Sequence, residues 1–217
     1  MPRSPTSKSL STYTPSHWPK DIQYLTAQQY NSSVKKDVLD IIRGQQPSES
    51  HQPLKPQPSF VVIRRIAGPI DHPASAFCAY KNDRRCPTQL QYKQAMGQFG
   101  LFAAKNIPSR TYLLDYLGEV HCDDRPSSDY DLSLYRSLDG LVSVGVDASA
   151  MGNEGRFVND YRGIRAKPNA QFEERRIENG ELRMSIWTGS KVIKKGEEIL
   201  VSVGALECTP IFDRDRY

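Results

Sequence analysis

Short strand-like segments recur between turns from residue 60 to residue 203, and no long amphipathic helix interrupts them. They are rich in the β-branched, aliphatic and aromatic residues that favour strands. The segments are FVVIRRI at 60–66, LLDYL at 113–117, DLSL at 131–134, LVSVGV at 141–146, ELRMSIW at 181–187 and EILVSV at 198–203. This pattern predicts a mainly β domain of short, irregular strands, and it excludes a helical bundle and a doubly wound α/β fold.

The segment ELRMSIW has the clearest strand periodicity in the chain. Its apolar residues Leu182, Met184 and Ile186 alternate with Arg183 and Ser185. Because successive side chains of a strand point to opposite faces, this alternation predicts a strand with one buried apolar face and one polar face.

The first 58 residues differ in composition from the rest of the chain. They hold eight of the 15 prolines and one glycine, and Ser, Thr and Gln supply much of the remainder. Such a composition cannot bury a core alone, so we expect residues 1–58 to be largely disordered. Within them, residues 27–43 place apolar side chains on one helical face before Gly44, a residue that suits a helix C-cap. The residues of this face are Tyr30, Val34, Val38, Ile41 and Ile42. A helix over 27–43 is expected to dock on the domain or on a partner.

Charge and cysteine content exclude several classes of protein. The 29 Lys and Arg residues against 25 Asp and Glu give a net charge of +4, and the signs are interspersed, so no nucleic-acid-binding stripe is expected. Cys78, Cys86, Cys122 and Cys208 form no CxxC pair and no cluster with zinc-ligand spacing, so no metal site is expected. The sequence has neither a signal-peptide pattern nor an apolar run near the ~20 residues of a membrane helix. We therefore expect a monomer of the nucleus or cytoplasm that contacts neither membrane nor nucleic acid directly.

Three motifs follow one another in the second half of the chain. The stretch MGQFGLFAAKNIPSRTYLLDYLGE at 96–119 holds a glycine-bearing turn and ends in a YLG triplet. RFVNDYRG at 156–163 is followed by PNA at 168–170, and GEEILVSVG closes the series at 196–204. Together they resemble the SET domain of protein-lysine methyltransferases, with its GxG-type turn, its YxG, its RFxNH segment and its closing GEEL/I segment. By this resemblance, 97–204 is the SET domain, 59–96 holds a lead-in strand and an insertion at 75–96, and 205–217 is a short tail.

The resemblance carries expectations about fold and activity. In the SET family the RFxNH strand and the closing segment pass through one another as a pseudoknot, which brings the cofactor and the substrate lysine to opposite ends of a narrow channel. It therefore implies a fold of short curved sheets, S-adenosylmethionine as the cofactor, and a protein lysine, for example in a histone tail, as the substrate. Tyr116 is implied to line the lysine channel. The residues implied to contact the cofactor are Gly97, Gln98, Phe99, Gly100, Arg156, Phe157, Asn159 and Asp160.

The chemistry of such a reaction sets its own requirements. Methyl transfer from a sulfonium to an amine is an in-line displacement, so alignment of the reacting atoms supplies much of the acceleration. A lysine, whose pKa is ordinarily about 10.4, must also be neutral, and a dry apolar channel favours the neutral form. Tyrosine hydroxyls and backbone carbonyls at the channel floor orient the amine and accept weak CH···O contacts from the methyl group. An aromatic hydroxyl is therefore a functional element.

The sequence departs from the SET pattern at positions that bear on activity. The family carries a tyrosine one residue before its last glycine, but this chain has Val203, which has no hydroxyl. Asp160 stands where the family usually has histidine, and there are no recognisable pre-SET or post-SET zinc segments. Two interpretations follow: a lysine methyltransferase, or a catalytically impaired SET-fold module for protein interaction. A retained intron is a further hypothesis for the ending after Ser202 and for residues 75–96, and sequencing the transcript tests it.

Four other residues have roles that the sequence leaves open. Asn153 is expected to form the turn before the RFVND segment, with a cofactor contact as the alternative. Asp147 is expected to anchor or cap a loop, as short polar side chains often do. Tyr130 is expected to be half-buried in a sheet rather than to line the substrate site. Tyr161 is a candidate for partly replacing the hydroxyl that Val203 lacks.

Overall fold

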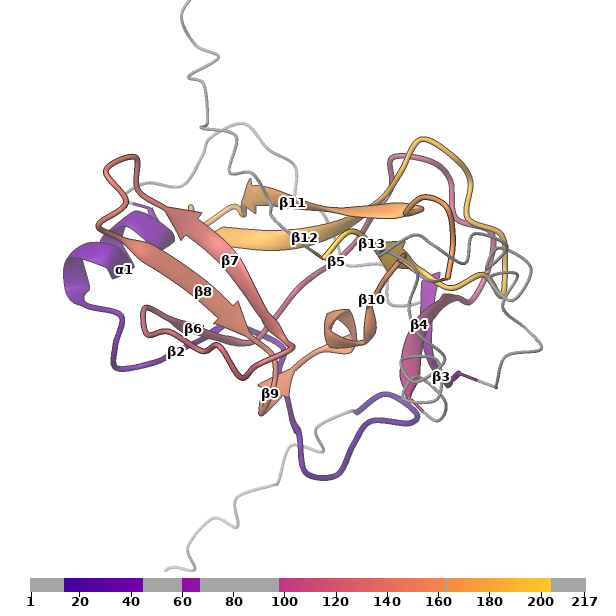
Figure 1. Cartoon of the computed structure of the whole chain (residues 1–217), viewed down its shortest axis with the longest axis horizontal. Coiled ribbons are helices and arrows are strands. Elements are labelled where there is room, and N and C mark those ends of the chain that lie inside the picture. The colour runs from indigo at the N-terminus through magenta and orange to yellow at the C-terminus, as the bar shows by residue number, and fades with distance from the viewer. Residues whose placement is uncertain (1–13, 45–59, 67–97, 163, 204–217) are drawn as a thin grey trace, which may run out of the picture.

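A computed structural model of the chain describes residues 14–44, 60–66, 98–162 and 164–203. In these ranges short strands surround an apolar core, which confirms the prediction of a mainly β, SET-type fold (Figure 1). The elements are β1 (Gln23–Tyr24), β2 (Gln29–Tyr30), α1 (Lys36–Arg43), β3 (Val61–Arg65), β4 (Phe99–Ala103), β5 (Tyr112–Asp115), β6 (Glu119–His121), β7 (Asp131–Arg136), β8 (Ser143–Asp147), β9 (Met151–Gly152), the 3-10 helix η3 (Glu154–Phe157), β10 (Asn159–Asp160), β11 (Ala170–Arg176), β12 (Leu182–Thr188) and β13 (Leu200–Val201). No helix in the described ranges is long and apolar enough to cross a membrane.

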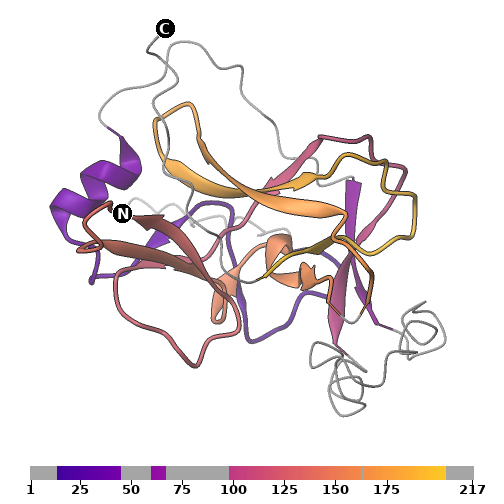
Figure 2. The same ribbon diagram turned by 45° about the horizontal axis from the view of Figure 1, so that its top comes forward.

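Strands from distant parts of the sequence meet in small sheets. β11, β12 and β5 form an antiparallel three-stranded sheet, and β2, β6, β8 and β7 form a four-stranded sheet. β3 pairs with β4, β1 with β9, and β10 with β13. Figures 1 and 2 place β10, β13 and η3 near the centre of the molecule, between the larger sheets and the β3–β4 pair.

The lead-in strand expected near residue 60 is present as β3. It pairs antiparallel with β4, so that Arg65 lies opposite Phe99 and Val61 opposite Ala103. Because β4 begins in the glycine-bearing turn of the first motif, the lead-in strand holds that turn in place. The expected insertion at 75–96, Gly97 and the tail at 205–217 lie outside the described residues.

The expected polar face of β12 is also buried, so the prediction of one buried face is wrong. Arg183 is 7% exposed and Ser185 is 0% exposed. β12 is the central strand of its sheet, and its polar side chains have hydrogen-bond partners. Arg183 donates through Nε to a carboxylate oxygen of Glu181 at 2.9 Å, and the Ser185 hydroxyl donates to Asp115 at 3.0 Å. Periodicity could not reveal this, because a hydrogen-bonded polar side chain can be buried at little cost.

Residues 14–44 belong to the folded domain, so the expected disorder does not extend over them. β1 pairs in parallel with β9, and β2 pairs in parallel with β6. Val34, Val38 and Ile42 join the apolar core. The partners of both strands lie far along the chain, Met151 for Gln23 and Glu119 for Gln29, and composition alone does not predict such pairing.

Helix α1 is shorter than predicted, because it begins at Lys36 and not at residue 27. Gln29 and Tyr30 are committed to the pairing with β6. The Asn31 side chain then accepts a hydrogen bond from the Ser33 backbone N–H at 2.9 Å, a turn that competes with a helix. The predicted end is confirmed: Gly44 follows Arg43 with a φ of 70°, a conformation that glycine tolerates best.

Replacement of Ile42 by alanine is expected to lower the free energy of unfolding by about 2–5 kcal/mol, because it removes a buried side chain from the core. Ile42 is 0% exposed, whereas its neighbour Ile41 is 39% exposed. Ile41→Ala is therefore the matched control, with an expected loss below about 0.5 kcal/mol. Urea unfolding followed by circular dichroism measures both. Equal midpoints for the two variants would show that α1 is not packed on the core in solution.

The second and third motifs lie side by side, as the resemblance implies. β10 pairs in parallel with β13, with Asn159 opposite Leu200. Asn169, from the PNA triplet, joins the same crossing: its Oδ1 accepts from the Leu200 backbone N–H at 2.8 Å, and its Nδ2 donates to the Glu198 carbonyl at 2.8 Å. The crossing therefore brings residues of both motifs into one site.

Candidate active site

Tyr116, the tyrosine of the YLG triplet, is a buried and firmly held side chain. It is 3% exposed, its hydroxyl donates to the Tyr130 carbonyl at 2.8 Å, and its ring meets Phe172 edge-on at 5.9 Å. Burial raises the pKa of the Tyr116 phenol far above its usual value, so the hydroxyl stays protonated. Tyr116 therefore presents a neutral hydroxyl in a fixed position.

Gly118, the last residue of the triplet, passes close to β8. A Cβ at Gly118 would lie 2.4 Å from the Asp147 carbonyl oxygen. The Gly118 backbone N–H donates to Gln28 Oε1 at 3.0 Å, and its carbonyl accepts from the Gln29 N–H at 3.2 Å. The glycine is thus required by a close backbone approach, and the N-terminal segment holds both of its peptide groups.

Arg156, the first residue of the RFVND segment, is directed into the protein. It is 8% exposed, and its Nε donates to the Ala148 carbonyl at 2.9 Å. Its guanidinium lies 4.3 Å from the centre of the Tyr130 ring, a cation–π contact. Tyr130 is therefore contacted twice: Arg156 packs against its ring, and the Tyr116 hydroxyl donates to its carbonyl. The exposed fraction of Tyr130 is 38%, and it precedes β7 directly.

Asn159 joins all three motifs. Its Nδ2 donates to Glu198 at 2.8 Å and to the Phe99 carbonyl at 3.4 Å, which links β10 to the closing segment and to the glycine-bearing turn. A Cβ at Gly100 would lie 2.6 Å from Glu198 Oε1 and 3.2 Å from Asn159 Nδ2, so a larger residue would have to displace these side chains. Because Nδ2 already donates to Glu198 and to the Phe99 carbonyl, the side-chain carbonyl of Asn159 remains to accept a hydrogen bond from a ligand.

Glu198 is a site residue that the sequence argument missed. It is 7% exposed, and its carboxylate accepts from Asn159. The available signal was an acidic residue at the start of the apolar run EILVSV. A carboxylate is rarely buried without a partner, so its position beside four apolar residues could have suggested a paired role.

Asp160 ties its own segment to the end of the domain. Burial alone would raise the pKa of Asp160, but hydrogen bonds from Arg162 and from the Val203 backbone N–H outweigh burial and hold the pKa below its usual value. The bond from the Val203 N–H is 2.7 Å long, and Arg162 also donates to the Val203 carbonyl. The Asp160 side chain is therefore structural. The Val203 side chain is 37% exposed and offers no polar atom to the site.

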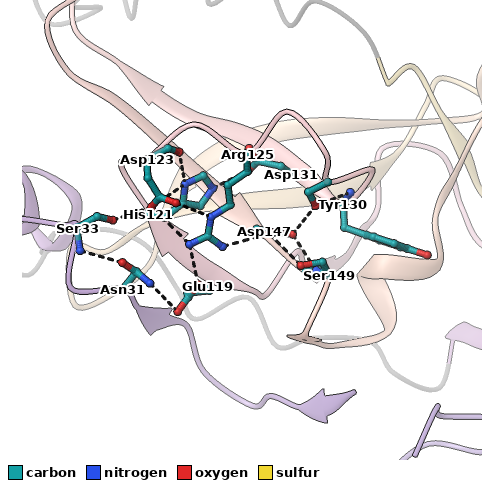
Figure 3. A network of polar contacts seen from close by, with 12 residues as sticks. Asn31, Ser33, Glu119, His121, Asp123, Arg125, Tyr130, Asp131, Asp147 and Ser149 are labelled. Carbon is teal, nitrogen blue, oxygen red and sulfur yellow. Dashed lines mark hydrogen bonds and ion pairs between the residues drawn. The ribbon is translucent and has the colours of Figure 1, made fainter. Parts of the chain in front are cut away.

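A polar network on the four-stranded sheet supports Tyr130 (Figure 3). Arg125 forms ion pairs with Glu119 at 2.8 Å, Asp123 at 3.1 Å and Asp147 at 3.1 Å. Burial alone would raise the pKa of Asp147, but hydrogen bonds from Ser149, Ser128 and Arg125 outweigh it and lower the pKa. Asp147 therefore anchors the loop before β7, as predicted, and the loop fixes the Tyr130 carbonyl.

Asn153 forms the turn into η3, as predicted. Its Oδ1 accepts from the Gly155 N–H at 3.2 Å and from the Leu117 N–H at 3.1 Å. Its Nδ2 donates to the Asp115 carbonyl at 2.8 Å. All of these bonds are internal, and they lock the second motif to the YLG triplet.

A cavity of about 230 Å³ lies between the N-terminal segment and the YLG triplet. Its walls come from β1, β3, β5, β12 and the start of η3. The lining residues are Tyr24, Leu25, Thr26, Val61, Leu114, Asp115, Leu117, Asn153, Glu154 and Arg183. None of the residues predicted to bind cofactor or lysine is among them. Among the described residues, no group of three or more His, Cys, Asp or Glu side chains is placed to hold a metal ion.

Four of the predicted site residues, Phe99, Gly100, Phe157 and Asn159, lie together, whereas Tyr116 and Arg156 contact Tyr130 instead. Phe99 and Phe157 meet edge-on at 6.2 Å, and Asn159 lies against Phe99 and Gly100. Gln98 is exposed at the start of the turn, and its carbonyl accepts from the Ile66 N–H at 2.8 Å.

Comparisons with known proteins agree with this arrangement. Residues 98–204 match the family model described as the SET domain. No curated protein matches the chain. A structure of ATXR5 with histone H3.1 mono-methylated on R26 shares 16% identity with a TM-score of 0.53 and covers 84% of this chain and 80% of that chain. A humanized mutant of the Chaetomium thermophilum Polycomb Repressive Complex 2 with the inhibitor GSK343 shares 28% identity, with a TM-score of 0.40.

Residues 98–204 of the chain thus form a domain of the SET family. The ATXR5 structure supports the fold alone at its level of identity. The match covers 49% of this chain but only 13% of the Polycomb chain, so it concerns a small part of that protein. The fold is that of SET-type lysine methyltransferases.

Proposed function

We propose that this protein transfers a methyl group from S-adenosylmethionine to a lysine side chain of a protein, with a histone tail as the substrate. The observation that supports this most directly is the convergence of all three motifs at Asn159, which bonds to Glu198 of the closing segment and to Phe99 of the glycine-bearing turn. Because ATXR5 was solved with histone H3.1, histone H3 is the substrate to test first. A histone substrate would place the protein in the nucleus.

The residues present fit the cofactor. By resemblance, the turn of Gly97, Gln98, Phe99 and Gly100 would lie against the ligand, and Asn159 would offer its side-chain carbonyl. Phe157 packs behind the turn, at 6.2 Å from Phe99. When bound, S-adenosylmethionine would supply an electrophilic methyl group on its sulfonium.

The other site residues lie where the lysine that accepts the methyl group would bind. A lysine channel lined by Tyr116, as the resemblance implies, would disfavour a charged lysine and therefore favour the neutral amine that the reaction needs. The Arg156 guanidinium packs against the Tyr130 ring. This contact keeps the Tyr130 carbonyl in place to accept a hydrogen bond from the Tyr116 hydroxyl. Asp160 and Arg162 fix the backbone at Val203. These residues orient the acceptor and exclude water.

Asn159→Ala is expected to weaken cofactor binding at least about tenfold, because it removes the side-chain carbonyl offered to the ligand and the hydrogen bonds that link Glu198 to the Phe99 turn. Calorimetric titration with S-adenosylmethionine measures this, and labelled methyl transfer to histone H3 measures the reaction. Gln171→Ala, which changes an exposed amide on β11, is the control and should bind as the natural chain does. A natural chain that takes up no S-adenosylmethionine would refute the proposed function.

A second candidate is a SET-fold module for protein interaction with little or no catalysis. Val203 favours it, because no hydroxyl stands at the position where the family has tyrosine. Tyr161 is partly buried next to the crossing, and its side chain makes no hydrogen bond within the described residues. Full residual activity in Tyr161→Phe would exclude Tyr161 as a substitute. Binding of S-adenosylmethionine without transfer would favour the second candidate.

A further inference from the structure

An N-terminal strap, residues 14–30, lies directly against two of the cofactor motifs. Trp18 meets Phe157 edge-on, with ring centres 5.6 Å apart, and the ring of His17 is 6.0 Å from that of Phe99. Since Phe99 and Phe157 also meet at 6.2 Å, the strap and both motifs share one aromatic cluster. Phe99 belongs to the glycine-bearing turn and Phe157 to the RFVND segment.

The strap is held in this position by its own contacts. The Trp18 indole N–H donates to the Ile22 carbonyl at 2.7 Å, and the Trp18 ring meets Tyr24 edge-on at 5.0 Å. His17 has a φ of 68°, a left-handed conformation that costs a non-glycine residue free energy and persists only where the surroundings fix it. Trp18 therefore occupies a defined place.

Backbone pairing attaches the strap to both sides of the site. The Leu25 N–H donates to the Gly152 carbonyl at 2.7 Å, just before the turn into the RFVND segment. On the other side, Gln28 and Gln29 bond to the N–H and the carbonyl of Gly118. The Tyr24 hydroxyl donates to the Glu154 carboxylate at 3.1 Å. The strap thus joins the YLG triplet to the second motif.

We propose that Trp18 is a positioning residue of the cofactor site and that docking of the strap and binding of S-adenosylmethionine are coupled. The inference rests on the proposed function. The Trp18 indole fixes Phe157, and through it the ring and backbone of Phe99, in the arrangement that the cofactor requires. Coupling of this kind is reciprocal, so the cofactor must in turn alter the surroundings of Trp18.

The first test is calorimetric titration of the full chain with S-adenosylmethionine. Trp18→Ala is expected to weaken binding at least about tenfold, within the usual range of coupling between sites. Trp18→Phe, which keeps an aromatic ring against Phe157, should recover most of that loss. Lys20→Ala, an exposed strap residue, is the control and should bind as the natural chain does. Equal affinity of Trp18→Ala and the natural chain would overturn the inference while leaving the proposed function intact.

The second test covers the case in which Trp18→Ala does not fold. The sequence has two tryptophans, so Trp187→Phe leaves Trp18 as the only indole. This replacement is mild, because the Trp187 indole N–H is buried without a hydrogen-bond partner among the described residues. Saturation with S-adenosylmethionine should change the emission of Trp18. Cofactor binding with unchanged emission would overturn the coupling, and a natural chain that binds no cofactor would overturn both proposals.

Discussion

Val203→Tyr is expected to raise the rate of methyl transfer to histone H3 by about 10²–10³-fold, the range by which one preorganised polar group commonly changes an enzymatic rate. The backbone at Val203 is fixed from both sides, since its N–H donates to Asp160 and its carbonyl accepts from Arg162. Val203 is 37% exposed, so an added ring can extend toward solvent. The substitution would therefore place a hydroxyl on an existing framework, at the position where the SET pattern has tyrosine. Labelled methyl transfer at saturating cofactor measures the change.

Val203→Phe is the matched control, because it adds the ring without the hydroxyl. It should leave the rate near that of the natural chain, and cofactor affinity should stay within about threefold in both variants. A gain with phenylalanine equal to that with tyrosine would mean that packing, and not the hydroxyl, limits the reaction. A natural chain that already transfers methyl groups as fast as the tyrosine variant would show that Val203 is no defect.

Part of the strand content could be predicted from the sequence because strand propensity and turn residues are local. Six strands overlap the segments picked out by their composition, namely β3, β5, β7, β8, β12 and β13, whereas β4, β6, β9, β10 and β11 lie outside those segments. The strap could not be predicted in this way. β1 and β2 hold only two residues each, and their partners lie far along the chain at β9 and β6. Local pattern carries no information on such pairing.

The site was predicted through its motifs, and the structure adds the contacts between them. Asn159 and Gly100 were identified from their motifs, but their common partner Glu198 was not, because this contact depends on the crossing of β10 and β13. Asp160 shows the same limit. In the sequence, aspartate at a position where the family usually has histidine suggests a lost contact. In the structure, the Asp160 carboxylate accepts hydrogen bonds from Arg162 and from the Val203 N–H.

The second large effect is expected at Gly118, where alanine should lower the free energy of unfolding by about 3 kcal/mol or more, at the upper end of overpacking costs. The added Cβ would lie 2.4 Å from the Asp147 carbonyl oxygen, 2.6 Å from the Asp147 carbonyl carbon and 3.0 Å from the Ala148 nitrogen. All three atoms are backbone, and β8 is held there between β6 and β7, so no side chain can move aside.

Thermal unfolding measures the effect of Gly118→Ala, with an expected fall in Tm of roughly 6–12 °C for a chain of this size. Gly140→Asn is the control. Gly140 has a φ of 72° and no atom within 4 Å of an added Cβ, and asparagine tolerates that conformation, so its cost should stay below about 1 kcal/mol. Because the strap bonds to both peptide groups of Gly118, Gly118→Ala should also weaken S-adenosylmethionine binding. A melting temperature unchanged from that of the natural chain would show that β8 can yield, and the YLG glycine would then need another explanation.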